Sequence, residues 1–197
     1  MILDKKLLRL ELLGLAFTAA GAYFMHGLYA ATDRGLIGIL FGCVNDSIWE
    51  SCKTLLLPYL LWAMLELLCL GGRMRRFTVA KTVSLILLVV LFLSLCALYH
   101  TIGGTSWQTA ELLFAAVSVM CAFALSYFLM RSALNLSELF PPALFLLFLL
   151  MALYFSLTPF PMKNFLFKDP TTGMYGILPR DLDYGAIALD TMYFFRG

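Results

Sequence analysis

Residues 79–99 read VAKTVSLILLVVLFLSLCALY, and Lys81 is the only charged side chain among them. A helix of about 20 apolar residues crosses the roughly 30 Å hydrocarbon core of a bilayer, so this run predicts a transmembrane helix. Four other runs predict four more, at residues 7–31, 47–70, 110–130 and 142–157, and residues 136–140 can lengthen the last. We therefore expect an all-α membrane protein, a bundle of about five transmembrane helices.

The composition supports this fold class. The chain of 197 residues is 62% hydrophobic and 13% charged, against about 45–50% and about 25% in soluble domains. Lipid must therefore cover much of the surface, and membrane lipid is the expected partner. The net charge of +2 with scattered basic residues argues against nucleic-acid binding. The sequence leaves the oligomeric state open.

Basic residues predict the orientation, because short cytoplasmic loops carry an excess of Lys and Arg. The densest cluster lies between the second and third runs: Arg73, Arg75, Arg76 and Lys81. We therefore expect a multi-pass protein of the cell membrane with a cytoplasmic N-terminus. Residues 1–158 would form the bundle, and the aromatic-rich residues 159–197 an extracytoplasmic tail packed on its outer mouth. Glu11 and Glu66 should pair at the cytoplasmic interface with arginines of the basic cluster or with Arg9.

Two features depart from plain spanning helix. Residues 35–44 are apolar but too short to span, which predicts a re-entrant or interfacial half-helix between helices one and two. Pro58 lies inside the second run, where it removes a backbone hydrogen bond and favours a kink. Kinks suit a cavity between helices and also occur in inert bundles.

The richest polar segment is residues 43–53, CVNDSIWESCK. On a helix Asp46, Glu50 and Lys53 share one face, and Ser47 with Glu50 matches a capping box. The segment is therefore either a well-capped helix start or a site, because a charge at membrane depth costs about 2.5–3.5 kcal/mol and tends to mark function. Cys43 and Cys52 flank it and could form a disulfide.

The two histidines of the chain, His26 and His100, fall on the same predicted outer side as Asp46 and Glu50. Imidazole and carboxylate groups suit an acid/base site or a proton relay. The set His26, His100 and Glu50 could also hold a divalent metal such as zinc, with a position left open for water. Neither His-x-x-x-His nor His-Glu-x-x-His spacing supports a metal, so the cofactor stays open. The simpler alternative is that each histidine hydrogen-bonds locally at the interface.

A second polar motif, Asp169-Pro-Thr-Thr-Gly173, lies in the tail. Proline fixes φ and glycine permits positive φ, so the composition predicts a turn. It could also act as a lid that carries Asp169 over the outer mouth. Residues expected to support a site or the scaffold around it are Asn45, Trp49, Lys53, Asp169 and Tyr175.

These two motifs carry a resemblance. Val44-Asn-Asp-Ser-Ile-Trp-Glu50 with Lys53 resembles a Val-Asn-Glu-Ser-x-Trp-Glu-His-x-Lys signature, and residues 167–177 resemble Phe-x-Asp-Pro-x-Thr-Gly-x-Tyr-Gly-Ile. Both are similar to signatures of a family of small bacterial multi-helix membrane proteins that bear a domain of unknown function. Cys52 stands where that signature has histidine, which weakens a metal reading there. The resemblance implies no activity, but it implies that both segments belong to one site or scaffold.

Three functions stay open. The first is an intramembrane enzyme acting on a lipid or isoprenoid-like substrate, with His26, Asp46, Glu50 and His100 as catalytic residues that converge at the outer face. The second is a small transporter, channel or ligand-binding protein, which predicts a polar path toward Glu11 and Glu66. The inner halves of the helices look almost wholly apolar, which argues against such a path. The third is a structural or partner-binding subunit that docks through its aromatic tail.

Overall fold

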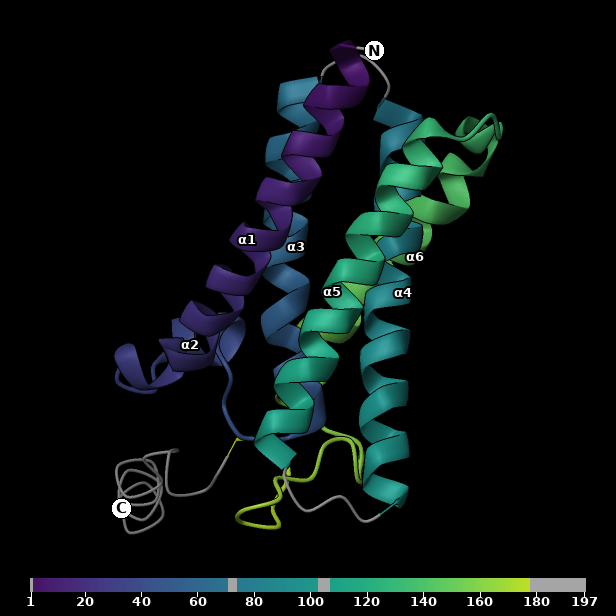
Figure 1. The fold of residues 1–197 in the computed structure, drawn as a ribbon. Coiled ribbons are helices and arrows are strands. Elements are labelled where there is room, and N and C mark those ends of the chain that lie inside the picture. The colour runs from purple at the N-terminus through teal and green to yellow at the C-terminus, as the bar shows by residue number, and fades with distance from the viewer. Residues whose placement is uncertain (1, 71–73, 103–106, 178–197) are drawn as a thin grey trace, which may run out of the picture.

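A computed structural model describes residues 2–70, 74–102 and 107–177 as a bundle of long helices (Figure 1). Five of its helices are long and apolar enough to cross a membrane. The elements in chain order are α1 (Ile2–Ala31), α2 (Leu36–Phe41), α3 (Ile48–Leu70), α4 (Met74–Thr101), α5 (Trp107–Arg131), the 3-10 helix η1 (Leu136–Leu139) and α6 (Phe140–Ser156).

The predicted all-α bundle is confirmed, and each of the five predicted spans lies on one long helix. Residues 136–140, predicted to lengthen the last span, form η1 and the first residue of α6. The half-helix between helices one and two is the short α2, which folds back onto the end of α1 (Figure 1). Its glycines permit that contact, because a Cβ at Gly38 would lie 2.8 Å from the Cα of Tyr29.

The two ends of the bundle differ. One end holds α2, the start of α3 and residues 157–177, and the N-terminus lies at the opposite end (Figure 1). We name them the outer and inner ends, after the orientation that the basic residues predict. Helix α4 contacts α3, α5 and α6, while α1 packs on α3 and α5. An apolar core of α3, α4 and α5 side chains fills the space between these helices and includes Tyr154 of α6.

Small residues bring α1 close to its neighbours. A Cβ at Gly14 would lie 2.4 Å from atoms of both Trp62 and Phe123, and one at Gly21 would lie 2.6 Å from Pro58. Close backbone approach at glycine is typical of helix pairs in membranes. Trp62 adds a bond, since its indole N–H donates to the carbonyl of Leu10 at 3.0 Å. Helix α3 continues through Pro58, whose ring packs where Gly21 leaves room.

Basic side chains donate hydrogen bonds to carbonyl groups at the inner ends of two helices. Lys6 donates to the carbonyl of Cys69 in the last turn of α3 at 2.6 Å. Arg76 donates to the carbonyl of Leu129 near the end of α5 at 2.9 Å and also to Ser132. Cations stabilise helix C-termini because the last carbonyls are unpaired and carry partial negative charge. Part of the inner basic cluster thus has a structural role.

Candidate functional site

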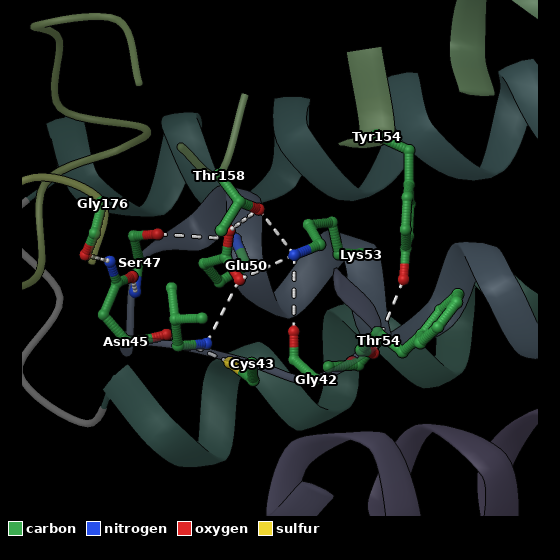
Figure 2. A network of polar contacts seen from close by, with 12 residues as sticks. Gly42, Cys43, Asn45, Ser47, Glu50, Lys53, Thr54, Tyr154, Thr158 and Gly176 are labelled. Atoms are coloured by element: carbon green, nitrogen blue, oxygen red, sulfur yellow. Dashed lines mark hydrogen bonds and ion pairs between the residues drawn. The ribbon is translucent and has the colours of Figure 1, made fainter. Parts of the chain in front are cut away.

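At the outer end, three buried side chains form what we call the outer cluster: Glu50 and Lys53 of α3, and Thr158, which follows α6 (Figure 2). Lys53 Nζ lies 3.0 Å from Glu50 Oε2 and donates to Thr158 Oγ1 at 2.6 Å. The Thr158 hydroxyl in turn donates to Glu50 Oε1 at 2.7 Å. The cluster therefore ties the start of α3 to the segment that leaves α6.

The outer cluster is balanced in charge and in hydrogen bonds. Glu50 also accepts the backbone N–H of Val44 at 3.2 Å, and Lys53 donates to the carbonyl of Gly42 at 3.4 Å. The ammonium lies 5.2 Å from the centre of the Tyr154 ring. One cation thus meets one anion, and both Glu50 oxygens and all three Lys53 donors have partners. A saturated buried pair of this kind fixes structure and offers no free position to a ligand.

Of the two hydrogen bonds that make the predicted capping box, the start of α3 has one. Glu50 N–H donates to Ser47 Oγ at 3.4 Å, as predicted. The other half differs, because Asn45 Oδ1 accepts the Ser47 N–H at 2.9 Å. The Glu50 carboxylate reaches into the outer cluster instead, since Lys53 and Thr158 offer it charged and hydroxyl donors.

The two sequence motifs touch each other. The backbone N–H of Trp49 donates to the carbonyl of Leu166 at 3.0 Å. The centre of the Trp49 ring lies 5.5 Å from that of the Phe167 ring. Asn45 Nδ2 donates to the carbonyl of Gly176 at 2.7 Å. Gly176 has φ of +65°, and a Cβ there would lie 2.9 Å from Pro161, so this position requires glycine. Residues 43–53 and 167–177 therefore form one scaffold at the outer end.

Asp169 organises the turn in which it lies. Its carboxylate accepts the N–H and hydroxyl of Thr171, at 2.8 and 2.7 Å, and the hydroxyl of Thr172 at 2.7 Å. Burial opposes ionisation, but these bonds to Thr171 and Thr172 prevail and hold the Asp169 pKa below its ordinary value. The predicted turn is present, with Gly173 at φ of +71°, and the carboxylate is occupied within it. Tyr175 is exposed beside this turn.

The other predicted site residues do not join Glu50. Asp46 is exposed and precedes α3, so the prediction that it shares a face with Glu50 and Lys53 is wrong. His26 is exposed on α1, and His100 is exposed at the end of α4, stacked on Phe165 with 5.2 Å between ring centres. Within residues 2–70, 74–102 and 107–177, no three His, Cys, Asp or Glu side chains gather as metal ligands. Among the described residues, no hydrogen bond or ion pair joins His26, Asp46 or His100 to Glu50.

A different grouping lies at the edge of the outer end. Glu111 of α5 lies near Ser51, His26 and Asp46, and among the described residues its buried Oε1 has no hydrogen-bond partner. We call these four residues the outer rim. They come from α1, α3, α5 and the segment before α3, so the rim lies where α1, α3 and α5 meet.

Cys43 and Cys52 are both free thiols, so the suggested disulfide does not form. Cys43 points at the carbonyl of Asn45, at 3.0 Å, while Cys52 lies in the apolar core with Cys96. Burial, and secondly the Glu50 carboxylate, raise the pKa of the Cys43 thiol well above its ordinary value. Cys43 is therefore held as an unreactive thiol.

The inner half of the bundle holds a second buried cluster, which the sequence did not reveal. Lys81 Nζ lies 2.7 Å from Oε2 of Glu11 and 2.7 Å from Oε2 of Glu66. These three residues, the inner triad, come from α4, α1 and α3 and are at most 5% exposed. Ser126 of α5 donates to Glu11 Oε1 at 2.7 Å. Glu11 and Glu66 were expected to pair with arginines at the interface, and that prediction is wrong.

The inner triad is balanced in neither charge nor hydrogen bonds. Two carboxylates share one ammonium, which leaves one negative charge if both are ionised. Among the described residues, Oε1 of Glu66 has no hydrogen-bond partner, nor has the buried hydroxyl of Tyr59 or of Ser84. Tyr59 has Glu11, Glu66, Ser84 and Ser126 as its polar neighbours. Aromatic rings surround the ammonium, the nearest being Phe123 at 5.0 Å.

One signal for the triad was present in the sequence. Lys81 is the one charged residue of the run 79–99, and Glu66 is the one charged residue of residues 54–70; charges at membrane depth tend to be functional. Lys81 was instead assigned to the cytoplasmic basic cluster. The Lys81 side chain is buried in the triad, so it does not count toward the cytoplasmic excess of basic residues. The orientation is then predicted from Arg73, Arg75 and Arg76 of that loop.

Comparison with known proteins gives a family and no activity. No solved structure and no curated protein matches the chain. The family model of DUF6512, a family of unknown function, matches residues 6–177. That match covers both clusters and the scaffold at the outer end. The chain belongs to the DUF6512 family.

Proposed function

We propose that this protein binds a proton at the inner triad and belongs to the transporter or channel class of small membrane proteins. The observation that carries the proposal is that Glu11 and Glu66 share the single ammonium of Lys81 inside the bundle. In the orientation that the basic residues predict, the triad lies toward the cytoplasmic side and the outer cluster toward the outside.

A proton is the ligand that the charge count favours. One uncompensated carboxylate at membrane depth is costly, and two carboxylates at one site rarely ionise together. A single proton would make the triad neutral. Glu66 Oε1 has no partner in the described part of the chain, so it has room to carry that proton and to exchange it.

The contrast with the outer cluster supports a functional rather than a structural role. Glu50 and Lys53 are matched one to one and use their hydrogen-bonding capacity. The inner triad has surplus charge and unused polar atoms at equal burial. Partly satisfied buried networks are unfavourable for stability, and such groups in membrane spans mark proton or ion pathways.

Infrared spectroscopy of the purified protein in detergent or lipid tests the proposal. A protonated buried carboxyl group has a C=O band distinct from that of a carboxylate. We expect the wild type to show this band at neutral pH, and Glu66→Gln to remove it, because Glu11 and Lys81 then balance each other without a bound proton. Glu138→Gln, at an exposed glutamate of η1, is the matched control. A wild-type spectrum without the band would overturn the proposal.

The hypothesis of an enzyme acting on a lipid or isoprenoid-like substrate keeps one supporting observation. His26 and Asp46 each lie near Glu111 at the outer rim, where an acid/base pair could reach a lipid headgroup. Binding of lipid to the purified protein, compared between wild type and a His26→Ala/Glu111→Gln variant, separates the two proposals. Proton binding at the inner triad does not require the rim to contact lipid.

A further inference from the structure

We infer that protons reach the inner triad from the outer rim, along a line of polar side chains at the interface of α1, α3 and α5. The inference rests on the proposed proton site and names the route that supplies it. Helices α1 and α5 place polar groups on this interface at the outer, middle and inner levels of the bundle, and α3 places them at the outer and inner levels.

Helix α1 carries the first row of polar side chains along the route. Its buried positions beyond the first two turns include Glu11, Gly14 and Thr18, and the spacings of three and four put them on one face. Thr18 is fully buried, and within the described residues its hydroxyl has no hydrogen-bond partner. Glu11 and Thr18 thus place two polar side chains on this face, seven residues apart, on either side of the close contact that Gly14 makes with Trp62 and Phe123.

Helix α5 carries a second row of polar side chains, and its chain direction is opposite to that of α1. Glu111 and Ser118 are seven residues apart and so face nearly the same way. Ser118 is fully buried, and its hydroxyl too lacks a partner in the part of the chain that the structure describes. Ser126, farther along, donates to Glu11.

Contacts between the helices show which polar side chains lie at the same depth in the bundle. The Ser126–Glu11 bond fixes the inner level, and the fit of Gly14 against Phe123 lies one turn above it. Glu111 beside His26 fixes the outer level. Thr18 and Ser118 therefore fall at a common middle level between triad and rim. Helix α3 follows the same order, with Ser51 at the rim and Tyr59 and Glu66 at the triad.

The hydroxyls without protein partners indicate how a proton could pass between successive levels. Successive levels are about seven residues apart, which is about 10 Å along a helix. That distance suits about three hydrogen-bonded waters, and buried waters bind at polar groups that lack protein partners. Each hydroxyl accepts one hydrogen bond and donates another, so a proton that enters at the rim displaces one at each link until Glu66 or Glu11 receives it. Bonds to hydrogen are exchanged and nothing is oxidised.

Among the described residues, the titratable groups named for this route lie at its two ends. The titratable groups at the inner level are Glu11 from α1, Glu66 and Tyr59 from α3 and Lys81 from α4, while α5 contributes the Ser126 hydroxyl. At the outer level they are His26, Asp46 and Glu111, with the Cys43 thiol near Asp46 and Glu111. Thr18 and Ser118 between them cannot hold charge, so they can pass a proton only through hydrogen bonds.

The test measures how fast the protonated carboxyl band of the triad shifts when the protein is moved into D2O. In Thr18→Val/Ser118→Ala we expect the band to keep its size and the exchange to slow by about tenfold or more, equivalent to about 1.4 kcal/mol of added barrier. Thr18→Ser retains the hydroxyl and should exchange at the wild-type rate. Ser94→Ala, at an exposed position of α4, should also do so. If the double variant does not fold, Ser118→Ala alone should still slow exchange.

An unchanged exchange rate in Thr18→Val/Ser118→Ala, with the band present, would overturn the route and leave the proton site intact. A wild type without the band would instead remove the proposed function. The entrance is tested separately. Glu111→Gln should slow exchange, whereas Glu138→Gln at the inner end should not, and the reverse result would place the entrance at the inner end.

Discussion

Replacing Lys81 by methionine should destabilise the bundle in a way that depends on pH. Methionine fills a similar volume but leaves Glu11 and Glu66 without their shared cation. In the wild type Lys81 Nζ lies 2.7 Å from an oxygen of each carboxylate, and the variant has an uncharged side chain in place of that ammonium. Removing one partner of a buried ion pair costs about 3–5 kcal/mol, and we expect a loss of this size at neutral pH.

The pH dependence follows from the number of bound protons. The wild-type triad needs one proton to be neutral, and the Lys81→Met triad needs two, while exposed glutamates of the unfolded chain are ionised above about pH 4.3. Stability falls as pH rises wherever the folded state holds more protons. One additional proton adds about 1.4 kcal/mol per pH unit to that fall. From about pH 8 to pH 5 the variant should thus recover about 4 kcal/mol relative to wild type.

The assay is reversible unfolding in mixed lipid and denaturing detergent across that pH range, followed by circular dichroism. Lys81→Met/Glu66→Gln needs only one proton, so its pH slope should return to that of wild type. Lys163→Met, at an exposed lysine of the outer loop, should leave both stability and slope unchanged. A Lys81→Met loss that is the same at pH 5 and pH 8 would refute the charge argument.

Three further predictions concern packing and the outer end. Gly14→Ala should lower the free energy of unfolding by about 1–3 kcal/mol because its methyl group meets Trp62 and Phe123, whereas Gly27→Ala meets nothing within 4 Å and should be neutral or stabilising in the same assay. Lys53→Met should cost about 3–5 kcal/mol and speed tryptic cleavage at Lys163 and Lys168; wild-type cleavage rates would contradict the role of the outer cluster. Asp169→Asn should weaken the turn by about 1–2 kcal/mol near pH 7, seen as faster hydrogen exchange over residues 166–177. Because the folded pKa of Asp169 is lowered, its contribution is present above the ordinary value of 3.8 and is lost as pH falls through the folded pKa, so variant and wild type should converge in acid.

The scaffold at the outer end was partly visible in the sequence. The helix start at Ser47 and the turn at Asp169 are local features, and each depends on side chains within a few residues of the backbone groups they satisfy. That the two segments belong together was implied by their resemblance to one family. Only the folded chain shows the contacts that join them, through Asn45, Trp49 and Phe167.

By itself the sequence determined the number of helices long and apolar enough to cross a membrane and the approximate place of each along the chain, because burial in lipid requires long apolar runs whatever their neighbours are. It could not determine which charges meet. Glu11, Glu66 and Lys81 lie on three different helices, and their pairing depends on helix rotation and level, which glycine contacts such as Gly14 against Trp62 fix. For the same reason His26 and His100, alike in sequence position at helix ends, lie exposed and apart from Glu50. Tertiary packing alone decided that the surplus charge sits in the inner half of the bundle.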